Sequence, residues 1–180
     1  MFTLGLTGGI ATGKTTATDF FKAKGIDVID ADEVSRSLQQ KGQQGYKKIV
    51  EKFGSEVLDA NEEIDRAKLR EVAFSTEANR ATLEAIMHPM IRAQIANLFG
   101  QVKSKWAIYS APIWSGKNQF SRNLIIDAPK AIQIERINKR DKNAIELAEK
   151  IINQQMGYKE RISFADDFIM NDEGLDEFKA

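Results

Sequence analysis

Residues 8–15 of the chain read Gly8-Gly9-Ile10-Ala11-Thr12-Gly13-Lys14-Thr15. This order matches the pattern G-x-x-x-x-G-K-[ST], in which glycines let the backbone curl with its N–H groups facing inward around phosphate oxygens. A helix that starts directly after such a loop presents its positive N-terminal end to the same anion. The stretch therefore predicts a phosphate-binding loop between a strand and a helix.

The end of this loop carries two groups with predicted chemical roles. The Lys14 ammonium can reach the β- and γ-phosphates of a nucleotide, and the Thr15 hydroxyl can ligate Mg²⁺. We therefore expect residues 8–15 to bind ATP together with Mg²⁺, with Lys14 acting in catalysis.

The residues around the loop predict the strand and the helix that it needs. Residues 2–6 form a short apolar run that leads into Thr7 and the glycines, which is typical of a buried strand ending in a turn. From Lys14 the apolar residues keep helical spacing up to Gly25, a typical helix stop, and residues 26–30 predict a second strand. Such a β-loop-α-β unit implies parallel strands with a right-handed crossover.

The rest of the chain predicts an α/β fold with a helical insertion. Helical patterns recur at residues 45–53, 65–74, 77–87 and 89–102, and strand-like runs return at residues 106–109, 123–126 and 168–170. Five strands with helices between them predict a three-layer α/β/α sandwich with a five-stranded parallel sheet. We expect a single domain over residues 1–180, with a nucleotide-binding core of residues 1–32, 104–136 and 164–180, a helical insertion of residues 33–103 and a helical lid of residues 137–163.

Two aspartates, Asp30 and Asp32, stand at the end of the second predicted strand. In a doubly wound sheet the carboxyl ends of the strands face the ligand crevice, and strand periodicity puts both side chains on one face. A carboxylate there can accept the proton of an acceptor hydroxyl or support Mg²⁺. We predict Asp32 as the catalytic base and Asp30 as a metal-site residue. The alternative is that Asp30, Asp32 or Glu33 only caps the next helix.

Composition and charge limit the classes of partner. Twenty-six basic residues balance twenty-six acidic ones, which gives no reason to expect nucleic acid or an anionic membrane as a partner. The chain has no cysteine and a single histidine, His88. No stretch resembles a signal peptide or approaches the roughly 20 apolar residues of a membrane span. We expect a cytoplasmic protein that is a monomer or a weak homo-oligomer.

Several stretches together resemble one family. Residues 6–16, LTGGIATGKTT, followed by residues 28–36, VIDADEVSR, are similar to the opening of bacterial dephospho-CoA kinases. The resemblance continues in Phe53-Gly54, Asp65-Arg66, Leu69-Arg70-Glu71, Phe74 and His88-Pro89-Met90-Ile91, and later in Arg136, Arg140-Asp141, Gln155, Arg161 and residues 165–171. It covers about residues 4–174, and the order of these elements narrows the match from all P-loop proteins to this family.

The resemblance implies a nucleotide-kinase-like P-loop fold and a reaction in which ATP phosphorylates the ribose 3′-hydroxyl of dephospho-CoA, the last step of coenzyme A biosynthesis. It implies that Asp32 is the base for that hydroxyl and that Arg140 is a lid arginine acting on the transferring phosphoryl group. Thr16, Arg136 and Asn171 join the loop as predicted ATP-binding residues. Arg66, Arg70 and His88 are implied to line the dephospho-CoA site, with helix pairing and helix-boundary roles as the alternatives.

Two other functions remain open from the sequence. Residues 138–141, NKRD, match the guanine-reading N-K-x-D pattern of a non-catalytic GTP switch, although they lie in a charged helical stretch and the chain contains no D-x-x-G. Another small-metabolite or nucleoside-monophosphate kinase would share the loop, Mg²⁺ and the lid, although the D-G-x-P-R element of nucleotide kinases is absent. The chain also departs from the family at Ala11, where glycine is usual, at Gly116, where glutamate is usual, and at Tyr158, where a lid arginine is common.

Overall fold

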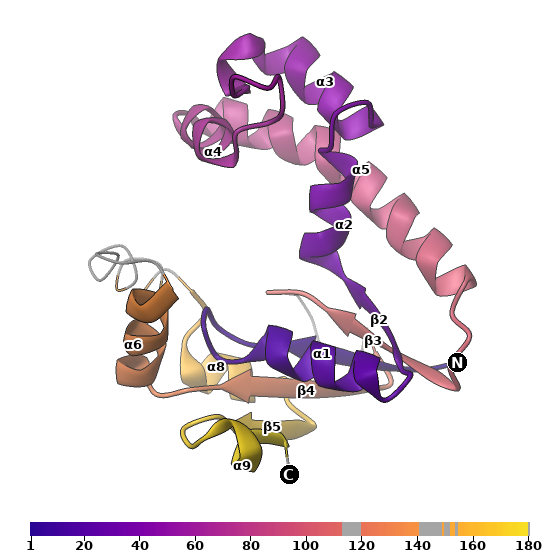
Figure 1. The fold of residues 1–180 in the computed structure, drawn as a ribbon, viewed down its shortest axis with the longest axis vertical. Coiled ribbons are helices and arrows are strands. Elements are labelled where there is room, and N and C mark those ends of the chain that lie inside the picture. Colours follow the sequence, from indigo (N-terminus) through magenta and orange to yellow (C-terminus); the bar gives the residue numbers. More distant parts are fainter. Residues whose placement is uncertain (113–119, 141–148, 150–151, 154, 180) are drawn as a thin grey trace. The chain divides into compact units, whose positions relative to one another are not determined.

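The computed structural model describes residues 1–112, 120–140, 149, 152–153 and 155–179. Five strands form one sheet in the order β2-β3-β1-β4-β5, and every neighbouring pair is parallel (Figure 1). Their bounds are Phe2–Thr7 for β1, Asp27–Asp30 for β2, Trp106–Ser110 for β3, Arg122–Asp127 for β4 and Asp167–Met170 for β5. The predicted five-stranded parallel sheet is confirmed, and each strand lies where its apolar run predicted it.

Strand β1 lies in the middle of the sheet, between β3 and β4. Leu6 of β1 is paired with Ser110 of β3 and with Leu124 of β4. Strands covered on both faces read as continuous apolar runs, and in β4 every residue after Arg122 is buried. The central position of β1 brings its last residue, Thr7, to the middle of the carboxyl edge of the sheet, where the glycine loop begins.

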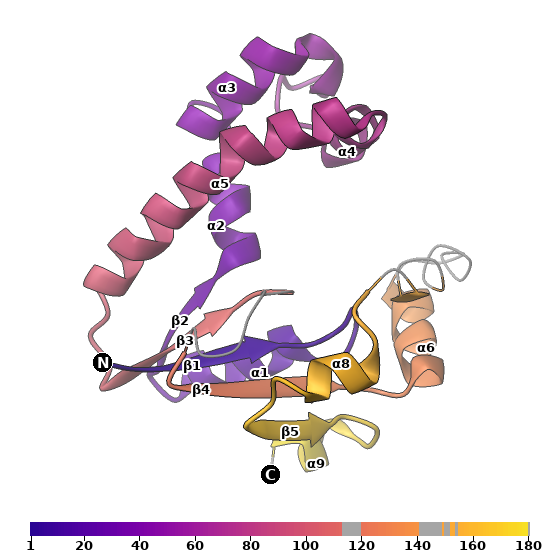
Figure 2. The same ribbon diagram turned by 180° about the vertical axis from the view of Figure 1, so that it is seen from behind.

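Helices cover both faces of the sheet. α1 spans Lys14–Ala23 and α8 spans Tyr158–Ile162, and the two views show them on opposite faces (Figures 1 and 2). α6, Lys130–Arg140, follows β4, and α9, Leu175–Lys179, follows β5. α1 ends as predicted, because Gly25 adopts a left-handed φ of 80° just beyond it. The arrangement is the predicted three-layer one.

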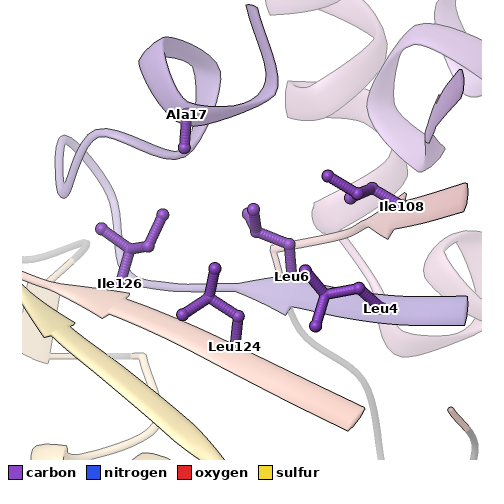
Figure 3. Packing of buried hydrophobic residues seen from close by; sticks show 6 residues of the cluster. All are labelled: Leu4, Leu6, Ala17, Ile108, Leu124 and Ile126. Carbon is purple, nitrogen blue, oxygen red and sulfur yellow. The ribbon is translucent and has the colours of Figure 1, made fainter. Parts of the chain in front are cut away.

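A cluster of buried apolar side chains joins α1 to the sheet (Figure 3). Its members are Leu4, Leu6, Ala17, Ile108, Leu124 and Ile126. Phe21 of α1 and Phe178 of α9 pack against this cluster. Burial of a large apolar side chain stabilises a fold by about 1.5–3 kcal/mol. Because the cluster anchors α1 on the sheet directly after the glycine loop, it also determines where that loop ends.

Residues 31–101 form a second compact unit, and residues 1–30 with 102–180 form the first. The second unit consists mainly of helices, which are α2 (Ala31–Leu38), α3 (Gln44–Phe53), a 3₁₀ turn (Ser55–Val57), α4 (Arg66–Phe74) and α5 (Glu77–Gly100). It has a core of its own, made of Ile49, Phe53, Val57, Leu69 and Met87. The predicted helices at residues 45–53 and 65–74 are confirmed.

The prediction of two separate helices at residues 77–87 and 89–102 is wrong, because α5 is one helix with Pro89 inside it. Proline removes a backbone hydrogen bond and crowds the preceding turn, so it often ends a helix. Here Met87 is buried in the core of the second unit, and Met90 and Ile91 pack against the same core. Apolar burial on both sides of Pro89 therefore maintains the helix.

In the described part of the chain, no helix, including α5, has the length and apolar character needed to cross a bilayer.

Asp27, the first residue of β2, stabilises the turn that leads into β3. Its Oδ2 accepts hydrogen bonds from the amides of Lys103 and Ser104, both at 2.8 Å, and from the Ser104 hydroxyl at 2.9 Å. These hydrogen bonds, above all the one from the Ser104 amide, lower the pKa of Asp27 below its ordinary value of 3.8. The charged form of Asp27 is therefore the form that the fold favours.

We expect Asp27→Asn to lower the Tm at neutral pH, because a carboxylate accepts these hydrogen bonds more strongly than an amide oxygen does. A carboxyl whose pKa is lowered by folding stabilises the protein above its unfolded pKa, and this stabilisation is lost as the pH falls through the folded pKa. The Tm difference between wild type and variant should thus shrink below pH 3.8. Thermal unfolding followed by circular dichroism measures it, with Asp19→Asn on the exposed face of α1 as the control. An equal Tm loss at neutral and acidic pH would contradict the prediction.

Candidate functional site

The loop between β1 and α1 has the backbone conformation of an anion-binding concavity. Ala11 has a φ of 57° and Gly13 a φ of 106°, both in the left-handed region. Left-handed residues in a turn direct successive N–H groups to the same side of the chain. Gly13 is also the N-cap of α1, so the positive end of that helix adds to the attraction for an anion.

Three side chains from other parts of the chain bind carbonyls of this loop. Each donates a hydrogen bond to one carbonyl: Gln133 to Ile10 at 2.8 Å, Arg136 to Ala11 at 3.3 Å and Asn171 to Thr12 at 2.9 Å. In a trans peptide the C=O group and the following N–H group point in opposite directions. The amides of residues 11–13 are therefore directed away from these three side chains and are available to a phosphate.

Lys14 and Thr12 bind the glycines at the start of the loop. The Lys14 ammonium donates to the carbonyls of Gly8 at 2.7 Å and Gly9 at 2.9 Å. The buried Thr12 hydroxyl also donates to the Gly9 carbonyl, at 3.0 Å. Thr15, in the first turn of α1, is exposed. The loop thus combines amides, an ammonium and an exposed hydroxyl, which is the set of groups that binds a nucleotide phosphate with Mg²⁺.

A cleft of about 480 Å³ runs along the loop and the first turn of α1. It is lined by residues 11–16, by Arg136 and Asn171, by Glu173 and Gly174, and by the apolar side chains of Leu175 and Phe178. Arg136 donates to the Asn171 side chain at 3.1 Å. The structure therefore brings the predicted loop residues together with Arg136 and Asn171, which are far away in the sequence.

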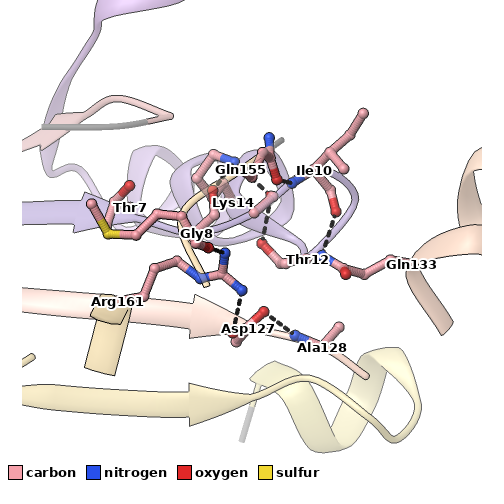
Figure 4. A network of polar contacts seen from close by, with 12 residues as sticks. Thr7, Gly8, Ile10, Thr12, Lys14, Asp127, Ala128, Gln133, Gln155 and Arg161 are labelled. Carbon is pink, nitrogen blue, oxygen red and sulfur yellow. Dashed lines mark hydrogen bonds and ion pairs between the residues drawn. The ribbon is translucent and has the colours of Figure 1, made fainter. Parts of the chain in front are cut away.

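The interpretation of the sequence missed Gln133 and an ion pair beside the loop. Asp127, the last residue of β4, is 2% exposed and accepts a hydrogen bond from Arg161 Nη2 at 2.7 Å (Figure 4). Its other carboxylate oxygen accepts from the Ala128 amide at 2.9 Å. An aspartate that ends an apolar strand, as Asp30 does, was the available signal for Asp127. Gln133 gave no such signal, because it is one of several polar residues in a charged helix.

The two predicted acidic residues lie on consecutive elements, so the expectation that strand periodicity puts both side chains on one face is wrong. Asp30 is the last residue of β2, whose carboxyl end lies at the same edge of the sheet as that of β1. Asp32 lies in the first turn of α2 and is exposed. It belongs to the helical unit of residues 31–101. The placement of Asp30 agrees with a role near the loop, and the role of Asp32 as the base stays a prediction.

The three predicted acceptor-binding residues are exposed on helices of the second unit. Arg66 is the first residue of α4, Arg70 follows one turn later, and His88 lies within α5. Arg66 lines a groove of about 320 Å³ together with Arg36 and Lys41. Glu63 lines the same groove, and Lys41 forms an ion pair with Glu62 at 2.7 Å, so the groove has a mixed charge. The roles of Arg70 and His88 stay predictions.

Comparison with known proteins decides the family. The model of the dephospho-CoA kinase family matches residues 2–177 of the chain. The chain belongs to the dephospho-CoA kinase family. The dephospho-CoA kinase of Acinetobacter baylyi is 42% identical over 96% of this chain and 90% of that protein, and the one of Mannheimia succiniciproducens is 40% identical over 96% of this chain and 82% of that protein. The solved structure of dephospho-CoA kinase from Campylobacter jejuni has a TM-score of 0.65 and 27% identity, and covers 98% of this chain and 91% of that chain.

Membership of the dephospho-CoA kinase family confirms the resemblance seen in the sequence, and it makes the chain a kinase rather than a GTP switch. The residues that matched the guanine-reading pattern begin on the exposed surface of a helix. Asn138 and Lys139 are exposed in α6, and Lys139 forms an ion pair with Glu135 one turn earlier, at 2.6 Å. Asp141, the last residue of that pattern, lies outside the described residues.

The departures from the family pattern differ in how they fit the structure. Ala11 adopts the left-handed conformation that glycine adopts at low cost, which costs a residue with a Cβ roughly 1–2 kcal/mol. Tyr158 starts α8, and its ring packs edge-on against Phe168 with 5.8 Å between centroids. Gly116 and the side chain of Arg140, the predicted lid arginine, lie outside the described residues, although Arg140 itself closes α6.

Gly8 gives a test of the loop geometry. A Cβ at this position would lie 2.1 Å from the Ile126 carbonyl oxygen, which belongs to the backbone of β4 and cannot turn away. We expect Gly8→Ala to displace the loop and to weaken ATP binding at least about tenfold, which corresponds to about 1.4 kcal/mol. Isothermal titration calorimetry with Mg-ATP measures this loss.

Gly100→Ala is the matched control for Gly8→Ala. Gly100 is the last residue of α5, and a Cβ there would have no neighbour within 4 Å. Alanine is a better helix residue than glycine, so this variant should keep the wild-type affinity for ATP and an equal or higher Tm. Wild-type affinity of Gly8→Ala would show that the loop does not bind ATP in this conformation.

Proposed function

We propose that the protein transfers the γ-phosphoryl group of ATP to the ribose 3′-hydroxyl of dephospho-CoA and releases CoA and ADP, the final step of coenzyme A biosynthesis. The observation that carries this proposal is the loop of residues 8–15 in a chain of the dephospho-CoA kinase family. Side chains from α6 and from the segment after β5 bind its carbonyls at residues 10–12, which leaves the amides of residues 11–13 to face the phosphates.

The cleft beside the loop suits ATP. The triphosphate would be bound by the amides of residues 11–16 and by the Lys14 ammonium. Arg136 and Asn171 line the same cleft, and Leu175 and Phe178 add apolar surface on which an adenine base can pack. ATP would therefore extend from the loop toward the C-terminal residues of the chain.

The oxygen donors at this edge of the sheet fit Mg²⁺. This ion prefers oxygen ligands and is usually bound by one or two protein groups together with substrate phosphates and water. The exposed hydroxyl of Thr15 and the carboxylate of Asp30 are groups of this kind. We assign both to the Mg²⁺ site, where the ion would neutralise charge on the β- and γ-phosphates.

Asp32, Lys14 and Arg140 are the proposed catalytic residues. Asp32 would accept the proton of the 3′-hydroxyl while the oxygen of that hydroxyl forms a bond to the γ-phosphorus and the bond to the ADP oxygen breaks. Lys14 and Arg140 would stabilise the negative charge on the transferring group. The chain's contribution is thus positioning, proton acceptance and charge stabilisation.

The second unit, residues 31–101, is the proposed acceptor-binding insertion, and its bounds are close to the expected residues 33–103. Arg66, Arg70 and His88 would contact dephospho-CoA there, since cations and ring N–H groups bind its phosphates. The lid predicted for residues 137–163 would exclude water and so limit ATP hydrolysis. We further propose that the protein acts in the cytoplasm as a monomer or a weak homo-oligomer.

The direct test of this function uses the whole chain. Incubation with Mg-ATP and dephospho-CoA should yield CoA and ADP, which mass spectrometry identifies by the added phosphate. Parallel reactions with GTP in place of ATP, or with a nucleoside monophosphate in place of dephospho-CoA, separate this reaction from those of other P-loop proteins. Formation of ADP without any CoA would contradict the proposal.

We expect Asp32→Asn to fold and bind ATP normally but to lose roughly 10²- to 10⁴-fold in the rate of phosphoryl transfer, the range of general base catalysis. A coupled ADP assay measures the rate, and calorimetry measures the binding of ATP. Glu33→Gln changes the neighbouring carboxylate in the same turn of α2 and should stay within a few-fold of wild type. Equal losses in both variants would show that the acidic residues serve the helix and not the reaction.

A further inference from the structure

Ile10, in the middle of the phosphate loop, has both of its backbone polar groups bonded to glutamine side chains (Figure 4). Its N–H donates to Gln155 Oε1 at 2.9 Å, and its carbonyl accepts from Gln133 Nε2 at 2.8 Å. Gln133 belongs to α6, and Gln155 lies shortly before α8. Two segments far apart in the sequence therefore bind one residue of the loop, an arrangement that we call the Ile10 clamp.

The clamp is closely packed against the loop. A Cβ added to Gly9 would lie 2.9 Å from Gln133 Nε2 and 3.2 Å from Gln155 Oε1. Gln133 is 3% exposed, so water cannot easily replace the hydrogen bond that it makes to Ile10. A buried polar group that loses its partner costs more free energy than an exposed one. The clamp thus packs against the loop at Gly9, which has no side chain.

Gln155 is kept in place by the ion pair at the end of β4. Arg161 pairs with Asp127 at 2.7 Å and also donates a hydrogen bond to the carbonyl of Met156, the residue after Gln155. The side chains of Arg161 and Asp127 are 13% and 3% exposed. A buried pair of this kind permits few alternative arrangements. The position of Gln155 is therefore tied to the central sheet.

We propose that Gln133 and Gln155 are positioning residues for ATP, which act by holding Ile10 so that the amides of residues 11–13 converge on the triphosphate. Glutamine suits both places because its amide group can donate to a carbonyl at one position and accept from an N–H at the other. The inference rests on the proposed function, since it assigns the clamp to the binding of ATP. It adds Gln133 and Gln155 to the residues that determine how ATP binds, and both act through Ile10.

The test replaces each glutamine by methionine, which has a similar length but neither donates nor accepts strongly at its end. In Gln133→Met and Gln155→Met, the Kd for Mg-ATP and the KM for ATP should rise about three- to tenfold, the effect of one hydrogen bond. The KM for dephospho-CoA should stay close to wild type in both variants, and the Tm should stay close to wild type in Gln155→Met, whose position is half-buried. A general structural role would instead change the Tm and both KM values.

The double variant tests whether the two glutamines act as one unit. If both act by holding Ile10, losing the second glutamine adds little once the first is lost, so the double variant should bind ATP within about threefold of the weaker single variant. If the loss of ATP affinity in the double variant equals the product of the two single losses, the proposal that the glutamines act as one clamp is overturned. Wild-type affinity for ATP in both single variants would also overturn it.

Gln101→Met, at an exposed position after α5, is the control and should match wild type in every measurement. If the buried change Gln133→Met prevents folding, Gln155→Met at its half-buried position tests the clamp with the same expectation. The Kd is measured without dephospho-CoA. A wild-type protein that binds ATP but makes no CoA would therefore contradict the proposed function and leave the test of the clamp valid.

Discussion

The phosphate loop depends on hydrogen bonds that reach its carbonyls from the rest of the chain. A loop of glycines and small residues has no side-chain core of its own, and glycine loses more backbone entropy than any other residue when it is fixed. Gln133, Arg136 and Asn171 each bind one carbonyl and so determine which way the intervening peptides face. The anion-binding property of the loop is therefore a property of its surroundings as much as of its own sequence.

The strand order makes these contacts possible. β4 is the neighbour of β1, and β5 is the neighbour of β4, so residues that follow these strands reach the same edge as the loop. The pairing between β4 and β5 extends one residue past the end of β5, because the Asn171 amide donates a hydrogen bond to the Asp127 carbonyl at 2.7 Å. A parallel sheet with β1 in the middle thus delivers donors from α6 and from the C-terminal segment to one short loop.

Much of this could be predicted from the sequence, and the remainder depends on long-range contacts. The loop motif, the apolar runs and the stop at Gly25 are local signals, and they predicted the five strands and α1 correctly. Pro89 misled the prediction, because the packing that carries α5 through it comes from residues elsewhere in the second unit. Gln133 and Asp127 escaped notice since their importance lies in their partners, Ile10 and Arg161. The proposed roles of Asp32 and Arg140 rest on the family pattern, because no local pattern determines which hydroxyl a base will serve.

The two glycines at the start of the loop will tolerate evolutionary change in different ways. At Gly8 the obstacle to a side chain is the backbone oxygen of Ile126, and no substitution elsewhere can remove it. At Gly9 the obstacles are the ends of two side chains, Gln133 and Gln155. The clash of a side chain at Gly9 can therefore be relieved by a shorter residue at Gln133, the nearer of the two, at the cost of its hydrogen bond to Ile10. A change at Gly8 has no such relief. Covariation among descendants of this gene should accordingly link Gly9 with Gln133 and leave Gly8 invariant.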